Sequence, residues 1–273
     1  MKTLFYFFVL GFASTTMLTS AQNSAMVKFP DELPDGLELA DSPRTYEMTT
    51  DYYAYDLNAH FLNKRQFVAT ITRGLEGDSA RWNEVNYSES ADSYAPFPRG
   101  EKLNYLHDYT FKADAGIVNP GFFRDLPEAN TFVKNLFWDV LGFDVFAYCC
   151  WDSLKLNQEY SARDINGEVD LAGVGTFNNK DIKVTWLGIT RMNGELCAVI
   201  KYSVMNNPLS LKLENMSMTG RSHYWGEVYV SLEDKQIEYA GLSEDVLTNV
   251  KLKGMADELR GYTVRNIKLK KIN

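Results

Sequence analysis

The dipeptide Asn193-Gly194 lies between two stretches of alternating apolar and polar residues, and it constrains the fold more than any other feature. Asn-Gly favours a two-residue turn that joins neighbouring antiparallel strands. Such a turn pairs Met192 with Glu195 and Ile189 with Ala198, so that apolar side chains share one face. The chain is therefore expected to contain an antiparallel sheet.

The same register, continued outward, predicts how the rest of this hairpin faces. It places Leu187 opposite Ile200 on the apolar side. Trp186 then lies on the other side, opposite Lys201. Register and apolar pattern agree, as they should in a hairpin.

Further strands are expected on both sides of this hairpin, in segments 46–55, 66–72 and 81–88 and again after residue 200. A four-residue loop over 233–236 would pair Val230 with Tyr239. A last strand is expected over 262–272. Its lysines suit the solvated face of a strand at the sheet edge, where charge discourages pairing with other chains: Lys268, Lys270 and Lys271.

One amphipathic helix is expected, over about 127–141. Asp125 is a good N-cap and Gly142 is a natural stop. Apolar residues recur at helical spacing, and the opposite side carries Asn130, Lys134, Asn135 and Asp139. The sequence thus predicts an α+β fold, mainly antiparallel β, in which a curved meander sheet (an open or partly closed barrel) packs on one central helix.

The N-terminus predicts export from the cytosol. Residues 1–21 combine Lys2, a short apolar block and small residues near Ala21, as in a cleavable signal peptide. No cysteine follows that would carry a lipid anchor, so a secreted or periplasmic location is expected. Residues 22–44 are expected to be extended or partly disordered, and residues 45–273 to form a single β-rich domain.

Composition argues against several function classes. The formal net charge is −8, which disfavours nucleic-acid binding because neutralising phosphates requires clustered Lys and Arg. The apolar stretches predict no membrane span. The three cysteines and three histidines lack metal-ligand spacing, so no metal or cofactor is expected. One disulfide is open on the cysteine count, joining Cys197 to Cys149 or Cys150.

The candidate ligand-binding residues come from the helix and from aromatic positions in the strands. A sheet curved around a helix can shelter an apolar ligand between the two, a plan similar in architecture alone to that of lipocalins and periplasmic lipoprotein carriers. The helix would contribute Phe132, Leu136, Phe137 and Val140. The strands would contribute Trp186, His223, Trp225 and Tyr229. His223, Trp225 and Tyr229 share one strand face, opposite Tyr224 and Val228.

These features favour an exported, non-enzymatic binding or carrier protein for an apolar, lipid-like ligand. An envelope structural or assembly protein, which would act through contacts with another envelope protein, is the alternative. A hydrolase is a remote alternative, since it would need a site assembled from dispersed acids and histidines. No catalytic residue is predicted.

Overall fold

The structure, a computed structural model, describes residues 32–124, 126 and 131–272, all of which belong to one compact unit, Asp31–Asn273. The strands before the helix are β1 (Arg44–Asp56), β2 (Phe61–Leu75), β3 (Ser79–Ser90), β4 (Glu101–Lys102) and β5 (Tyr109–Lys112). The helix α1 (Thr131–Tyr148) follows. The later strands are β6 (Glu159–Ser161), β7 (Gly167–Asp170), β8 (Gly175–Asn179), β9 (Lys183–Met192), β10 (Glu195–Leu213), β11 (Met216–Ser231), β12 (Ile237–Leu252) and β13 (Leu259–Lys271). Short 3₁₀ helices are η1 (Asn104–Leu106), η2 (Ala115–Val118), η3 (Pro120–Phe123), η4 (Trp151–Ser153) and η5 (Arg163–Ile165).

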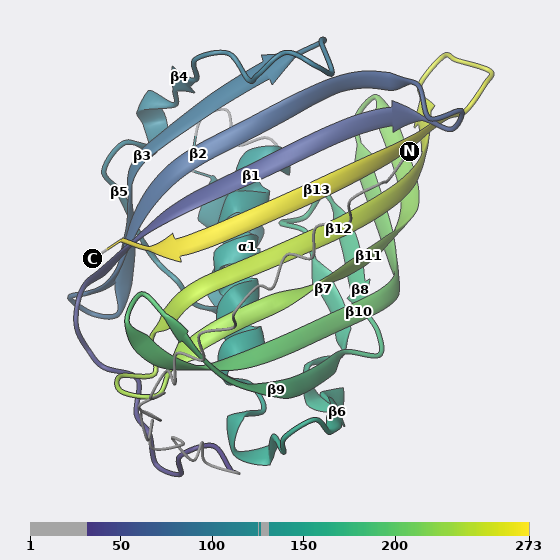
Figure 1. Ribbon diagram of the computed structural model, residues 1–273. Coiled ribbons are helices and arrows are strands. Elements are labelled where there is room, and N and C mark those ends of the chain that lie inside the picture. Colours follow the sequence, from purple (N-terminus) through teal and green to yellow (C-terminus); the bar gives the residue numbers. More distant parts are fainter. Residues whose placement is uncertain (1–31, 125, 127–130, 273) are drawn as a thin grey trace, which may run out of the picture. The chain divides into compact units, whose positions relative to one another are not determined.

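The strands form one antiparallel sheet with the order β4-β3-β2-β1-β13-β12-β11-β10-β8-β7. The long strand β10 pairs with β9 through its first half and with β8 through its second half. Figure 1 shows the curved sheet from its outer side, with α1 behind it. The fold class is confirmed: the structure is α+β, mainly antiparallel, with an open curved sheet packed on one helix.

The two faces of the sheet differ in chemistry, as strand alternation requires. We call the face against which α1 packs the inner face, and the opposite face the outer face. In β1, Tyr46, Met48 and Tyr52 are buried on the inner face, whereas Glu47 and Thr49 lie on the outer face. The expected strands over 46–55, 66–72 and 81–88 all fall within β1, β2 and β3.

The helix extends beyond its expected end. It continues past Gly142 to Tyr148, because Phe143, Phe146 and Ala147 bury further apolar surface in the core. A glycine inside a helix costs only about 1 kcal/mol, which this burial outweighs. The expected start at Asp125 and Pro127 lies outside the described residues.

The hairpin at Asn193-Gly194 is confirmed near its turn, where Met192 pairs with Glu195 and Ile189 with Ala198. Farther out the predicted register is wrong. A β-bulge leaves Leu187 as an extra residue, beside Gly188 with φ of 140°.

The bulge changes which side chain reaches the core. Trp186, rather than Leu187, lies opposite Ile200, and it is fully buried. Leu187 is 40% exposed. A single extra residue thus reverses the facing of every residue beyond it.

The second hairpin and the last strand also differ from expectation. Val230 pairs with Ile237 rather than Tyr239, because the Ser231 hydroxyl accepts from the backbone of Glu233 and Asp234 and turns the chain earlier. The last strand, β13, lies in the middle of the sheet between β1 and β12, not at an edge. Lys268 and Lys270 are exposed on its outer face, as expected.

Candidate functional site

The space between α1 and the sheet is filled by side chains. Leu136, Phe137 and Val140, three predicted ligand contacts, are at most 1% exposed. The Phe137 ring lies within 6.1 Å, between ring centroids, of five other aromatic rings, those of Trp82, Tyr109, Phe111, Phe122 and Phe123. These residues act as core in this conformation, so the space beneath the helix holds side chains where a ligand was expected.

The two ends of α1 contact the sheet through aromatic rings. Phe132 is half-buried, and its ring meets the Tyr52 ring edge-on at 5.1 Å and the Arg65 guanidinium at 4.9 Å. Near the other end, Phe146 stacks on Tyr202 with a centroid distance of 4.0 Å. These contacts fix how the helix crosses the strands.

The remaining predicted site residues do not join this group. Trp186 belongs to the core, and its indole donates to the Gly188 carbonyl at 2.8 Å. His223, Trp225 and Tyr229 lie on the outer face, where Trp225 is 37% exposed and the Tyr229 hydroxyl donates to Glu227 at 3.0 Å. Of the eight predicted residues, those of α1 and Trp186 therefore lie on the inner side of the sheet and the other three on the outer face, so they are not brought together as one site.

A buried ionic network, which the sequence reasoning missed, links α1 to the sheet. Arg265 of β13 donates through Nη1 to Asp139 of α1 at 3.0 Å and through Nε to Glu244 of β12 at 2.6 Å. The Ser222 hydroxyl donates to the other oxygen of Glu244. Asp139, expected on the polar side of the helix, thus faces the sheet and is 8% exposed.

This network holds two carboxylates against one guanidinium in a setting shielded from water. Burial raises the pKa of Asp139 to about 7; the Arg265 charge opposes this rise and the Glu244 charge adds to it. A second, partly buried pair ties the helix to β2, since Arg73 donates through Nη1 to Asp144 at 2.6 Å. The helix is therefore held by charge as well as by packing.

The sulfur and imidazole groups are scattered over several elements. Cys149 and Cys150 lie sulfur to sulfur at 2.9 Å, while the Cys197 thiol donates to the Glu195 carbonyl. All three cysteines are free thiols, and a bridge from Cys197 to Cys149 or Cys150 stays a prediction.

The histidines likewise sit on separate elements. His60 contacts Asp56 at 2.9 Å, His107 contacts Asp108 at 3.4 Å, and the His223 ring accepts from the Asn206 backbone at 3.1 Å. Both His–Asp pairs are largely exposed. Among the described residues, no group of three or more His, Cys, Asp or Glu side chains could hold a metal ion.

Beyond the last helix contacts, the inner face continues as an apolar surface at the ends of four strands. We call this surface the apolar tip. Ladder pairing places its members next to one another on the same face: Leu211, Leu213, Met216, Met218, Val250, Leu252 and Leu259.

The apolar tip is open to solvent in part. Leu213 is 41% and Leu259 is 48% exposed, whereas Leu211 is buried. Met216, Met218, Val250 and Leu252 are half-buried. Within the described residues, the contiguous core around α1 includes none of these seven side chains.

Such a surface can bind an apolar ligand. Contiguous exposed apolar area is uncommon on soluble proteins and marks interaction sites. Two of the seven side chains are methionines, which adapt their shape to irregular apolar partners. The alternation of Leu209, Leu211 and Leu213 was visible in the sequence, but the position of the helix, which leaves these residues uncovered, was not.

Comparison with known proteins adds little. No protein family and no curated protein matches the sequence. Among solved structures, a DUF1329 family protein from Desulfovibrio piger is similar over 85% of this chain and 87% of its own, with 9% identity and a TM-score of 0.15. That likeness carries no weight for fold or function. In the described part of the chain, no helix has the length and apolar character to cross a membrane.

Proposed function

We propose that the protein binds an apolar, lipid-like ligand on its apolar tip and has no catalytic role. The observation that supports this is the row of seven inner-face apolar side chains that continues past α1 and stays partly exposed. An acyl chain laid along Met218, Val250 and their neighbours would remove this surface from water, at about 25 cal/mol for each Å² buried.

In this view the ligand binds at the end of the sheet and not beneath the helix. Phe137 and its aromatic neighbours leave no room for a ligand without displacing α1, which one buried and one partly buried ion pair hold in place. The tip needs no such movement. Export from the cytosol, inferred from residues 1–21, is part of the proposal, since a carrier of this kind would act between membranes or outside the cell.

The direct test is titration of the purified protein with a fluorescent fatty acid, combined with mass spectrometry of co-purified lipid. We expect saturable binding. In the variant Met218→Glu, which puts a carboxylate in the middle of the tip, affinity should fall about tenfold or more, because the charge must be desolvated under the ligand.

Thr219→Glu is the matched control, because Thr219 is the next residue of β11 and is exposed on the outer face. It should bind as the unaltered protein does. Absence of saturable binding, or equal binding by Met218→Glu, would overturn the proposal. A protein that takes up no fatty acid and forms a defined oligomer would favour the assembly role instead.

A further inference from the structure

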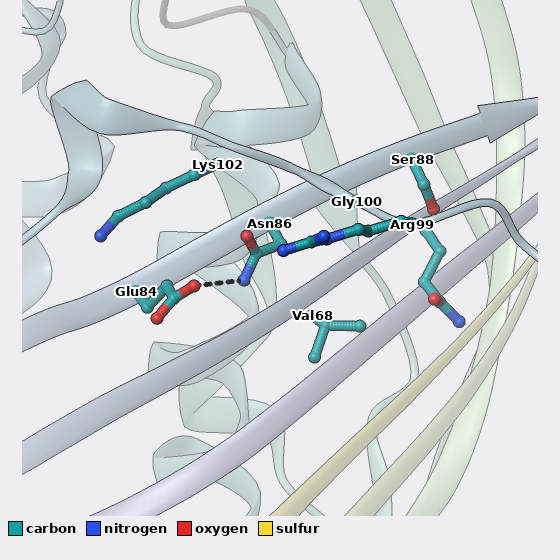
Figure 2. Close-up of a pocket in the computed structure, with 8 residues that line it drawn as sticks. Val68, Glu84, Asn86, Ser88, Arg99, Gly100 and Lys102 are labelled. Carbon is teal, nitrogen blue, oxygen red and sulfur yellow. Dashed lines mark hydrogen bonds between the residues drawn. The ribbon is translucent and has the colours of Figure 1, made fainter.

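A cleft on the outer face lies far along the sheet from the apolar tip, over β2 and β3. It encloses about 540 Å³, within the range of small-molecule sites. The loop that leads into β4 forms one wall, and the two strands form the floor (Figure 2). The lining residues are mostly polar: Gln66, Val68, Glu84, Asn86, Ser88, Arg99, Gly100 and Lys102.

The loop over residues 91–100 is fastened to the sheet. The Asp92 carboxylate accepts from the backbone of Tyr94 and Ala95 and so shapes the turn. Lys64, only 4% exposed, donates to the carbonyls of Ser93 and Ala95. The wall of the cleft is therefore built by defined contacts.

The second half of the loop is also packed closely against the sheet. The Phe97 ring lies over the Lys64 ammonium at 4.9 Å and contacts the Tyr53 ring. A Cβ placed on Gly100 would lie 3.0 Å from the Asn86 Cβ, so a larger residue here would require the loop or Asn86 to shift by a few tenths of an ångström. Both contacts hold the loop against the strands that form the floor of the cleft.

The donors in the cleft are largely uncommitted. Among the described residues, the side chains of Arg99 and Lys102 make no hydrogen bond or ion pair. Ser88 is 7% exposed and lines the cleft, yet its hydroxyl has no hydrogen-bond partner within the described structure. Because the hydroxyl faces the cleft and is not used within the protein, it is available to a ligand.

Other polar side chains of the lining already make hydrogen bonds within the protein. Glu84 accepts from the Asn86 amide at 2.9 Å, and Gln66 donates to Asp51 at 2.9 Å. In the view of Figure 2, Glu84 and Lys102 lie at one end of the cleft and Ser88 at the other. The lining thus presents two cations and one anion, which suits a ligand that carries a negative group together with hydroxyl donors.

We infer that this cleft binds a small polyhydroxylated acid, such as a sugar bearing one carboxylate or one phosphate. Arg99 and Lys102 pair with the anionic group, Ser88 at the other end donates to a sugar hydroxyl, and Glu84 accepts from another sugar hydroxyl. Val68, 36% exposed on the floor, contacts the apolar side of the sugar ring. This site is independent of the proposed lipid-like ligand.

The test is isothermal titration calorimetry of the full chain with three probes: glucuronate, glucose 6-phosphate and glucose. We expect at least one of the two acids to bind, and glucose to bind at least tenfold more weakly. Preference between the two acids tells a carboxylate site from a phosphate site. Binding of neither acid at 10 mM, or equal binding of glucose, would overturn the inference.

Variants assign the contacts. Arg99→Ala and Ser88→Ala should each weaken binding of the acid, Arg99→Ala by about tenfold or more, because a charge-assisted hydrogen bond is lost. Arg163→Ala, at an exposed arginine of η5, should leave binding unchanged. Full affinity in Arg99→Ala would show that the acid binds elsewhere. Circular dichroism of each variant separates loss of binding from loss of folding.

Discussion

Arg265 is the residue on which the contact between α1 and the sheet most depends. It is buried and serves both Asp139 and Glu244. Replacing one partner of a buried ion pair leaves a charge without compensation, which typically costs about 3–5 kcal/mol. The three residues of the network are therefore not equivalent: losing the arginine leaves two carboxylates together, whereas losing one carboxylate leaves a neutral pair.

The network predicts an unusual dependence of stability on pH. The pKa of Asp139 is raised from 3.8 to about 7 on folding, so between these values the folded protein holds a proton that the unfolded chain has lost. Through this group, stability is highest below pH 4 and falls as the pH rises towards 7. In Asp139→Asn this contribution disappears.

We expect urea unfolding at pH 5 and pH 8 to show the difference. The unaltered protein should lose more stability over this interval than Asp139→Asn, by on the order of 2 kcal/mol. Arg265→Met serves as the contrast and should be strongly destabilised at both pH values. Parallel pH dependence in the unaltered protein and Asp139→Asn would contradict the assignment.

At this scale the sequence pattern was informative about apolar residues and uninformative about charged ones. Leu136, Phe137 and Val140 were placed on the buried side of the helix, where they lie. Asp139 was placed on the solvated side, because helical periodicity cannot show that the facing strand carries Arg265, whose charge allows a carboxylate to be buried there. The available signal was a charged residue among apolar inner-face positions, Glu244 between Leu242 and Val246.

At the scale of single elements, two glycines differ in whether their surroundings leave room for a Cβ atom. Gly142 lies inside α1, and a Cβ added there would meet nothing closer than Phe146 at 4.0 Å. Gly226 lies in β11, and a Cβ there would lie 1.9 Å from the Gly241 carbonyl oxygen. The first glycine is a weakness of the helix, and the second is required by close strand packing.

We therefore expect Gly142→Ala to raise the free energy of unfolding by about 0.5–1 kcal/mol, since alanine loses less backbone entropy in a helix. Thermal or urea unfolding measures this directly. Gly226→Ala is the matched substitution and should destabilise the protein severely. A destabilised Gly142→Ala would mean that the helix surroundings are tighter than the structure has them.

Strand and helix positions were readable from the sequence, but their exact partners were not. The turn at Asn193-Gly194 fixed the first pairs of its hairpin, as turn chemistry should. The bulge at Leu187 could not be predicted, because its one sequence signal is Gly188, which adopts a φ of 140°. A single glycine in a strand does not by itself show where a bulge lies. The loop after Val230 escaped because hydrogen bonds of the Ser231 side chain decide where it begins.

For the molecule as a whole, the first and last long strands are neighbours at the middle of the sheet. β1 pairs with β13 over eleven residue positions, from Tyr46–Lys271 to Asp56–Gly261. Pairing between distant segments leaves no local signature, so the sequence predicted the class of fold but placed β13 at an edge. The apolar tip and the outer cleft were missed for the same reason, since both depend on which strands meet.

This arrangement predicts that β13 is essential. A chain ending at Gly254 lacks Arg265, Ile267 and Leu269, and it leaves β1 and β12 each without a partner on the edge that faces β13. We expect it to show no cooperative unfolding transition by circular dichroism and to aggregate through the exposed edges. A chain that lacks only residues 272–273, beyond the end of β13, should fold normally. Cooperative unfolding of the shorter chain would contradict this view of the sheet.

The central place of β13 also bears on how the protein is made. Before β13 is made, the nascent chain can form two separate partial sheets. One ends at β1 and the other at β12, and β13 is the strand that connects them. Each partial sheet has one unpaired strand edge until β13 is made and pairs with both. The sheet can therefore be completed only after β13 has been synthesised, and until then the exposed strand edges make the growing chain a substrate for chaperones.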